Sequence, residues 1–140
     1  MNIAQNLERS ARLFADAPAL RFEGRVYTYA ALEAAAGRAA HALLALGVER
    51  GSRIALFLPN VPEFAIVYLA AQKIGAVAVS LNALLRTEEI RFILRDSGAG
   101  VLFTTAALLP EATPLRGSVE TLRHVILCEG EAPGERTLAA

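Results

Sequence analysis

Four apolar segments recur along this chain at nearly constant intervals, and this regularity is the strongest constraint on its fold. The segments are Arg53–Leu58, Ala76–Leu81, Gly100–Thr104 and Arg123–Cys128. Successive segments are 23 or 24 residues apart, as measured at Ile54, Val77, Val101 and Val125. Near-continuous apolar runs are typical of parallel strands that are covered on both faces, and the intervals leave room for crossover helices. The spacing therefore predicts an α/β fold with a layered, mostly parallel sheet and helices on both faces.

A short β-hairpin and a helix are predicted ahead of this repeat. Ala19–Phe22 and Arg25–Thr28 read as two strands around Gly24, which can take the positive φ that a tight hairpin turn requires. Thr28 is predicted to cap the following helix through its hydroxyl, and Gly47 to end that helix.

The segments between the strands are also expected to be helical. Asn60 is predicted to cap a helix with Pro62 in its first turn, and this helix should end near Gly75. It is apolar around most of its circumference, which indicates burial. Thr87 is predicted to cap a further helix that ends at Gly98.

The first 14 residues, the stretch before the last apolar segment and the residues after it do not follow this strand–helix repeat. Ile3, Leu7, Ala11 and Phe14 recur at helical spacing and predict an amphipathic helix that docks on the rest of the chain. Pro110 and Pro114 limit the stretch before the last apolar segment to a short helix or loop. Residues 131–140 are expected to be a polar tail or a truncated continuation of the domain.

Composition excludes several classes of protein. The chain has 140 residues, of which 54% are hydrophobic, so global disorder is excluded. Fourteen basic and fourteen acidic residues give zero net charge, which argues against a nucleic-acid partner. The longest apolar run, Phe64–Ala71, is too short for a transmembrane segment. The single cysteine, Cys128, excludes an internal disulfide and favours a reducing, cytoplasmic location.

Motifs that carry chemistry are missing from the sequence. It contains no G-x-G-x-x-G, no G-x-x-x-x-G-K-[ST] and no G-x-S-x-G, so no catalytic or cofactor-binding residue is assigned. His41 and His124 lie too far apart for metal-ligand spacing, and no metal site is predicted. Glu88 and Glu89 fit a helix first turn better than an acid–base pair.

Topology leaves three candidate positions for ligand contact. Ligands of open parallel sheets bind at the carboxyl ends of the strands. Asn82, Thr104 and Thr105 lie at such ends, and helix capping does not account for them. These three residues are therefore the candidate ligand contacts.

The order and spacing of several short motifs resemble the acyl-CoA synthetases, members of the adenylate-forming (AMP-binding) ligase family. The motifs are Thr28-Tyr29, Leu46-Gly47-Val48, Arg50-Gly51-Ser52-Arg53-Ile54-Ala55, Leu58-Pro59-Asn60-Val61-Pro62-Glu63-Phe64, Gly75-Ala76-Val77, Ser80-Leu81-Asn82, Leu85-Arg86-Thr87-Glu88-Glu89-Ile90 and Asp96-Ser97-Gly98-Ala99. The resemblance covers residues 1–130, which it identifies as an incomplete N-terminal subdomain of such a ligase. Ser52 departs from the family, which usually has Asp there.

The resemblance implies a function for a longer protein. The family joins a carboxylic acid to coenzyme A with ATP and magnesium, through an acyl-adenylate. Its Ser/Thr/Gly-rich phosphate loop, Tyr-Gly-x-Thr-Glu segment, ribose-binding Asp and catalytic lysine have no counterpart in this chain. We therefore expect the chain to be inactive alone and to have the remainder of the ligase as its partner. The implied substrate is a fatty or other apolar acid, with aryl acids as the alternative.

Two other readings fit the same pattern. One is a stand-alone, non-catalytic α/β module that binds a protein partner or an acyl ligand. The other is a small flavodoxin-like nucleotide-binding protein, which the missing glycine-rich phosphate loop disfavours. On the ligase reading, apolar surface left uncovered in the isolated chain predicts self-association.

Overall fold

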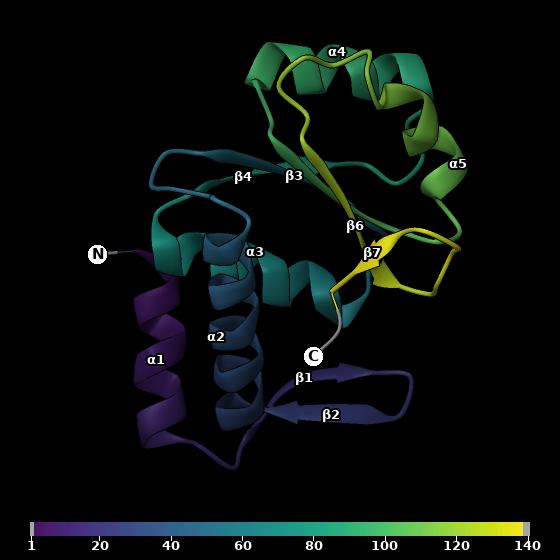
Figure 1. Ribbon diagram of the computed structural model, residues 1–140. Helices are drawn as coiled ribbons and strands as arrows, with labels where there is room; N and C mark the ends of the chain where they lie inside the picture. The colour runs from purple at the N-terminus through teal and green to yellow at the C-terminus, as the bar shows by residue number, and fades with distance from the viewer. Residues whose placement is uncertain (1, 139–140) are drawn as a thin grey trace.

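The chain folds around a five-stranded parallel sheet with helices on both faces, as Figure 1 shows in a computed structural model that describes residues 2–138. The helices are α1 (Ile3–Leu13), α2 (Tyr29–Ala45), α3 (Pro62–Ile74), α4 (Thr87–Ser97) and α5 (Leu109–Ala112), with a 3₁₀ turn at Thr113–Leu115. The strands are β1 (Pro18–Phe22), β2 (Arg25–Thr28), β3 (Arg53–Phe57), β4 (Val77–Leu81), β5 (Val101–Thr105), β6 (His124–Glu129) and β7 (Arg136–Thr137). The predicted fold class is confirmed.

The strand order in this sheet is β4-β3-β5-β6-β7, and every neighbouring pair is parallel. The chain crosses from β3 to one side, where it forms β4, and then returns to the other side of β3 to form β5. The direction of winding therefore reverses between β3 and β5. This reversal is the feature that creates a ligand-binding crevice in open α/β sheets.

Alternating side chains of the central strands face two separate cores. Ile54 and Leu56 pack with α2 and α3 on one face, whereas Ala55 and Phe57 pack with α4 and α5 on the other. All four side chains are completely buried. Figure 1 shows the two helical layers on opposite sides of the sheet. This double burial is the physical reason that β3 lacks an alternating polar pattern.

Helix α3 is buried as its apolar circumference predicts, because it lies between the sheet and the outer helices. It contacts α1, α2, β3 and β4, and none of its residues is exposed. Helix α1 also docks as predicted, but only the middle of the expected stripe packs, because Leu7 is buried and Ala11 half-buried. Ala4 and Leu7 are buried, whereas Ile3 and Phe14 are exposed. The apolar spacing therefore located this helix and part of its packed face correctly, but not its two end positions.

The hairpin and the first helix cap are confirmed. Strands β1 and β2 pair antiparallel around Glu23 and Gly24, whose φ angles are 46° and 78°. Two positive φ values are those of a type I′ hairpin turn. The Thr28 hydroxyl accepts a hydrogen bond from the Ala31 N–H at 3.1 Å and caps α2. Helix α2 ends just before Gly47, whose φ is 85°.

Two of the predicted caps are wrong. Asn60 does not cap α3, because Val61 occupies the N-cap position without a side-chain hydrogen bond. Thr87 is the first residue of α4 and not its cap, and Arg86 takes the cap position. The Thr87 hydroxyl instead donates to Glu111 Oε2 at 2.7 Å. The hydrogen bond to Glu111, which is distant in sequence, therefore replaces the helix cap that a threonine at this position suggests.

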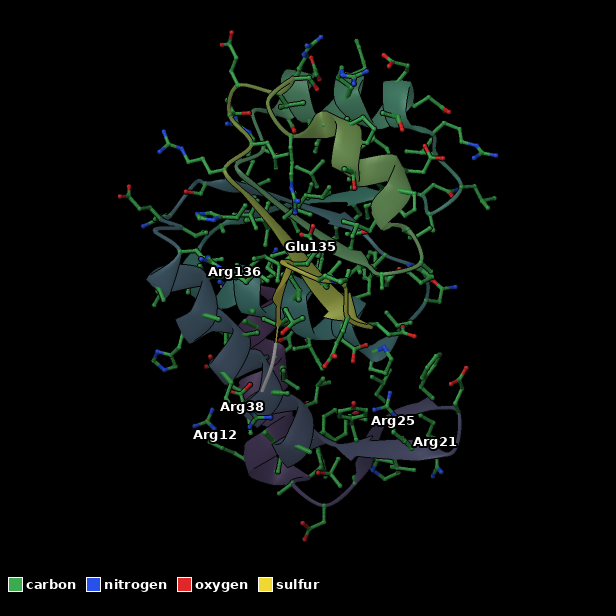
Figure 2. All side chains as sticks on the ribbon, turned by 45° about the vertical axis from the view of Figure 1, so that its right-hand side comes forward. Arg12, Arg21, Arg25, Arg38, Glu135 and Arg136 are labelled. Atoms are coloured by element: carbon green, nitrogen blue, oxygen red, sulfur yellow. The ribbon has the colours of Figure 1, made fainter. Side chains whose placement is uncertain are left out.

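Strand β7 itself was not predicted from the sequence, where residues 131–140 were expected to be a polar tail or a truncated continuation of the domain. It pairs parallel with β6, and the Leu138 N–H donates to the Leu127 carbonyl at 2.7 Å. Arg116 forms an ion pair with Glu135 in the turn before β7, and Figure 2 labels Glu135 there. A two-residue strand carries too little pattern to predict from sequence, and residues 139–140 lie outside the described part of the chain.

Candidate functional site

The topological switch places a candidate site at the carboxyl edge between β3 and β5. Strand β3 continues there into buried Leu58 and exposed Asn60, and β5 continues into Ala106. The Ala106 N–H donates to the Glu129 carbonyl at 2.9 Å, which ties the end of β5 to the end of β6. The edge is therefore a set of short, backbone-braced loops on a rigid sheet.

Asn82 lies at this edge but performs a local structural task. Its Oδ1 accepts a hydrogen bond from the Leu84 N–H at 2.9 Å, and its carbonyl accepts one from the Leu85 N–H at 3.1 Å. These bonds define an Asx-type turn between β4 and α4. Because β3 lies between β4 and β5, the sheet does not place Asn82 beside the two threonines.

Thr104 and Thr105 are both buried, on opposite faces of β5. Thr105 Oγ1 accepts a hydrogen bond from the Leu108 N–H at 3.2 Å and shapes the turn into α5. Thr104 is fully buried, and its Oγ1 has no hydrogen-bond partner among residues 2–138. An unpaired buried hydroxyl is costly, so Thr104 is the candidate whose presence local structure does not explain. Ligand contact at all three predicted residues stays a prediction.

Glu111 braces two loops of the carboxyl edge. Its Oε2 accepts from the Thr87 N–H at 2.9 Å and from the Thr87 hydroxyl, and its Oε1 accepts from Arg86 at 2.9 Å. The hydrogen bond from the Thr87 hydroxyl, followed by that from Arg86, lowers the pKa of Glu111. The carboxylate thus joins the start of α4, which follows β4, to α5, which follows β5.

Of the two glutamates predicted to lie in the first turn of α4, only Glu89 contributes to its cap. Glu89 Oε1 accepts a hydrogen bond from the Arg86 N–H at 3.2 Å and satisfies a free donor at the start of α4. Glu88 is exposed and forms an ion pair with Arg91 one turn later. Neither carboxylate is arranged for acid–base chemistry.

A small cavity of about 250 Å³ beside the end of β6 was not anticipated from the sequence. Cys128 and Ile66 form part of its wall, and Tyr27 of the hairpin closes one side. Its charged groups are Glu63, at the start of α3, and Arg38, one of several exposed arginines labelled in Figure 2. The only sequence signal was the row of small residues Ala35, Ala39 and Ala42 on α2, which leaves the space open.

Cys128 in this cavity is a poor nucleophile. Burial, followed by the charge of Glu63, raises the pKa of the thiol to about 12. The thiolate is the reactive form of cysteine, so almost none of it is present near neutral pH. The cavity therefore offers shape and apolar surface, with no activated group.

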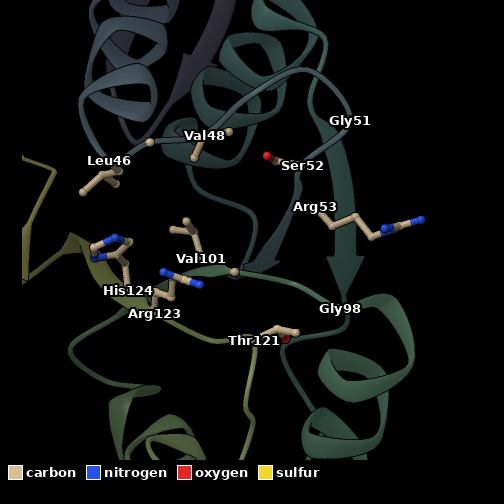
Figure 3. A pocket seen from close by; sticks show the side chains of 12 residues that line it. Leu46, Val48, Gly51, Ser52, Arg53, Gly98, Val101, Thr121, Arg123 and His124 are labelled. Atoms are coloured by element: carbon tan, nitrogen blue, oxygen red, sulfur yellow. The ribbon is translucent and has the colours of Figure 1, made fainter.

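Another hollow lies at the opposite edge of the sheet, at the amino ends of β3, β5 and β6. Figure 3 shows Arg123 and His124 side by side at this hollow, with Arg53 directed away from them. Its volume of about 320 Å³ exceeds that of the Cys128 cavity. Ligands of parallel sheets bind at the carboxyl edge, so size alone does not make this hollow the functional site.

Within residues 2–138, no three His, Cys, Asp or Glu side chains come together as a metal site would require. Among the same residues, no helix has the length and apolar character of a membrane span.

Comparisons with known proteins agree with this architecture. A family model described as AMP-binding enzyme matches residues 7–139. The chain is 34% identical over 140 residues to the crotonobetaine/carnitine–CoA ligase of Salmonella paratyphi A, covering 96% of this chain. It is 42% identical over 93 residues, 66% of this chain, to the long-chain-fatty-acid–CoA ligase FadD13 of Mycobacterium tuberculosis. The crystal structure of the anthranilate CoA ligase AuaEII superimposes with a TM-score of 0.88 and 31% identity over 91% of this chain.

The chain spans only part of each of these relatives. It corresponds to 27% of the Salmonella ligase, 18% of FadD13 and 25% of the AuaEII chain. Nearly all of the described fold therefore matches one segment of a larger enzyme architecture. The chain belongs to the AMP-binding enzyme family, the adenylate-forming ligases that include these acyl-CoA ligases.

Proposed function

We propose that this chain is the N-terminal part of an ATP-dependent acyl-CoA ligase. The observation that carries the proposal is the family match over residues 7–139, on a fold that superimposes on a CoA ligase. In this proposal the chain supplies a framework, namely a parallel sheet whose carboxyl edge faces the rest of the enzyme.

The proposed reaction has two steps. A carboxylate oxygen of the acid attacks the α-phosphorus of ATP, forming the acyl-adenylate and releasing pyrophosphate. The thiolate of coenzyme A then attacks the acyl carbonyl, forming the thioester and releasing AMP. ATP, magnesium and coenzyme A would be held by later parts of the ligase, because this sequence contains none of the family's nucleotide-binding motifs.

The proposed substrate is a fatty or other apolar carboxylic acid. Similarity to a long-chain-fatty-acid–CoA ligase at 42% identity supports this choice. The relatives also include ligases named for crotonobetaine or carnitine and for anthranilate, so the family alone does not select the acid. The lone Cys128 supports a reducing, cytoplasmic setting for the reaction.

Acid-dependent exchange of pyrophosphate into ATP tests this proposal. The whole protein should be assayed with a long-chain fatty acid, benzoate and carnitine. Exchange with the fatty acid is expected to be fastest. Faster exchange with benzoate or carnitine would contradict the proposed fatty-acid substrate. The absence of any acid-dependent exchange would contradict the proposed ligase activity.

We also propose that the 140-residue chain is inactive alone and self-associates. Support for self-association comes from apolar side chains that remain exposed, including Phe92 at 70% and Leu84 at 86%. Pyrophosphate release from ATP and a fatty acid by the purified chain, lost on its immunodepletion, would contradict the inactivity.

A further inference from the structure

The hollow at the amino edge of the sheet carries positive charge without a matching acidic group. Its volume is about 320 Å³, and the titratable residues of its wall are Arg53, Arg123 and His124. Among residues 2–138, no acidic side chain lines it. The hollow is therefore cationic, and the whole depth of the sheet separates it from the candidate site at the carboxyl edge.

The backbone at this edge holds Arg123 and His124 in place. Gly100, which precedes β5, lies between Arg53 and Arg123, and its N–H donates to the Arg53 carbonyl at 3.0 Å. Its carbonyl accepts from the Arg123 N–H at 2.8 Å and from the His124 N–H at 3.2 Å. Figure 3 shows the side chains of Arg123 and His124 next to each other at the hollow, whereas that of Arg53 is directed away.

These two side chains are not neutralised by the part of the chain that the structure describes. The ion pairs of residues 2–138 include Arg86, Arg91 and Arg116, but neither Arg123 nor His124. The charge of Arg123 is permanent, and histidine gains a second positive charge on protonation. Two adjacent cationic groups thus face one hollow without a counter-ion.

A neighbouring hollow shares Arg123 and His124 and increases the positive charge around them. Its wall also contains Arg116, Glu135 and Arg136. Glu135 Oε1 accepts a hydrogen bond from Arg116 Nη1 at 2.8 Å, and the two side chains form an ion pair. The charge of this glutamate is therefore already matched, and Arg123 and His124 lie in a positive environment on both sides.

We infer that Arg123 and His124 bind a phosphate group of a small molecule at the amino-edge hollow. An arginine fork donates two parallel hydrogen bonds to phosphate oxygens, and an imidazole N–H supplies a further donor. A phosphate group carries more negative charge than a carboxylate, which suits two adjacent cationic groups. The inference is independent of the proposed ligase activity, because it uses no residue of the carboxyl edge.

Charge complementarity argues for an anion in this hollow and against an apolar segment from elsewhere in the protein. An apolar segment that covered Arg123 would bury a charge without a partner, which is strongly unfavourable. An anion provides hydrogen-bond acceptors for the same side chain and balances its charge. An acidic side chain from another part of the protein is the competing occupant, and the experiment below distinguishes it from phosphate.

Equilibrium dialysis of the whole protein against radiolabelled inorganic phosphate, at an ionic strength held constant with chloride, tests this site. Arg123→Gln should weaken phosphate binding at least about tenfold, because two charge-assisted hydrogen bonds are lost. His124→Gln should weaken it less, and Arg123→Lys should restore part of the affinity by restoring the charge. Arg53→Gln is the matched control and should change the affinity by less than about threefold, because its side chain is directed away and salt screens exposed charges.

Unlabelled pyrophosphate and AMP, added separately as competitors, distinguish a free anion from a nucleotide as the source of the phosphate group. Absence of phosphate binding by the whole protein would overturn the site, as would equal weakening by Arg53→Gln and Arg123→Gln. A lower melting temperature of Arg123→Gln together with no phosphate binding would also overturn it, because an acidic side chain of the protein would then occupy the hollow. Pyrophosphate exchange is measured separately, so failure of the ligase proposal leaves this test intact.

Discussion

The only lysine of the chain joins three helices. Lys73 Nζ on α3 lies 2.6 Å from Glu33 Oε1 on α2 and 3.2 Å from Glu8 Oε1 on α1. Burial alone would lower the pKa of Lys73, but the hydrogen bonds to Glu33 and Glu8 raise it above its ordinary value. Because the raised pKa belongs to the folded state, this stabilisation is present at neutral pH and is lost only as pH rises through that value.

Replacing Lys73 with Met should destabilise the chain by about 1–3 kcal/mol, because a partly buried carboxylate is left without its cation. Glu33→Gln should cost more than Glu8→Gln, since the Glu33 side chain is 27% exposed and that of Glu8 is 48% exposed. Urea unfolding at pH 7 measures all three variants. Equal stability of Lys73→Met and the native chain would contradict this role.

Glu111 should make the chain sensitive to acid. Its pKa is lowered in the folded state, so its contribution is complete above the ordinary value near 4.5 and disappears as pH falls through the folded value. Glu111→Gln should therefore lower the melting temperature at pH 7 and make little difference below the folded pKa. Glu88→Gln is the control, because the exposed Glu88–Arg91 pair contributes little, and added salt screens it. A Glu111→Gln deficit that is unchanged at acidic pH would refute this assignment.

Residue-scale features were the hardest to predict from the sequence. The Thr28 cap was predictable because its donor, the Ala31 N–H, lies three residues away. The role of Thr87 was not, because its partner Glu111 lies 24 residues away. Lys73 and its two glutamates likewise come together only after three helices have packed.

At the scale of elements, a close approach of two loops fixes the carboxyl edge of the sheet. Gly130, after β6, has φ of +78°, and a Cβ built there would lie 2.6 Å from the Ala106 Cβ after β5. Gly134 has φ of +76° but open space around it. Alanine substitution at Gly134 therefore measures backbone strain alone, whereas alanine substitution at Gly130 measures backbone strain together with steric overlap.

Gly134→Ala should cost about 1–2 kcal/mol through its left-handed backbone alone. Gly130→Ala should cost about 1–3 kcal/mol more, because Ala106 cannot move aside without shifting the loop. Urea unfolding of the two variants measures the difference. Equal costs would mean that the β5 and β6 loops do not approach as closely as the structure shows.

The elements themselves were largely predictable. The 23- and 24-residue intervals and the apolar runs identified β3, β4, β5 and β6, because double burial removes polar residues from parallel strands. Strand β7 and the Cys128 cavity escaped prediction for different reasons. Strand β7 has only two residues and leaves no periodic pattern, whereas the cavity is lined by segments distant in sequence, among them Tyr27 and Cys128.

At the scale of the whole molecule, the chain combines a well-defined framework with few chemical groups. Fold and family followed from motif order and spacing and were confirmed by the match over residues 7–139. The candidate site could be placed at one edge of the sheet, but its chemistry could not be read from this chain. The hydroxyl of Thr104, which is fully buried and has no partner within the part of the chain that the structure describes, remains the main candidate for contact with a ligand or another part of the enzyme.

The most direct test of the central proposal is the size of the native protein, measured by immunoblot of source cells with an antibody against this segment. The chain has a mass of 14.9 kDa and spans 27% of the Salmonella relative. The account predicts a band several times larger than 14.9 kDa. A single band near 14.9 kDa would contradict the account, because the segment would then function without the rest of a ligase.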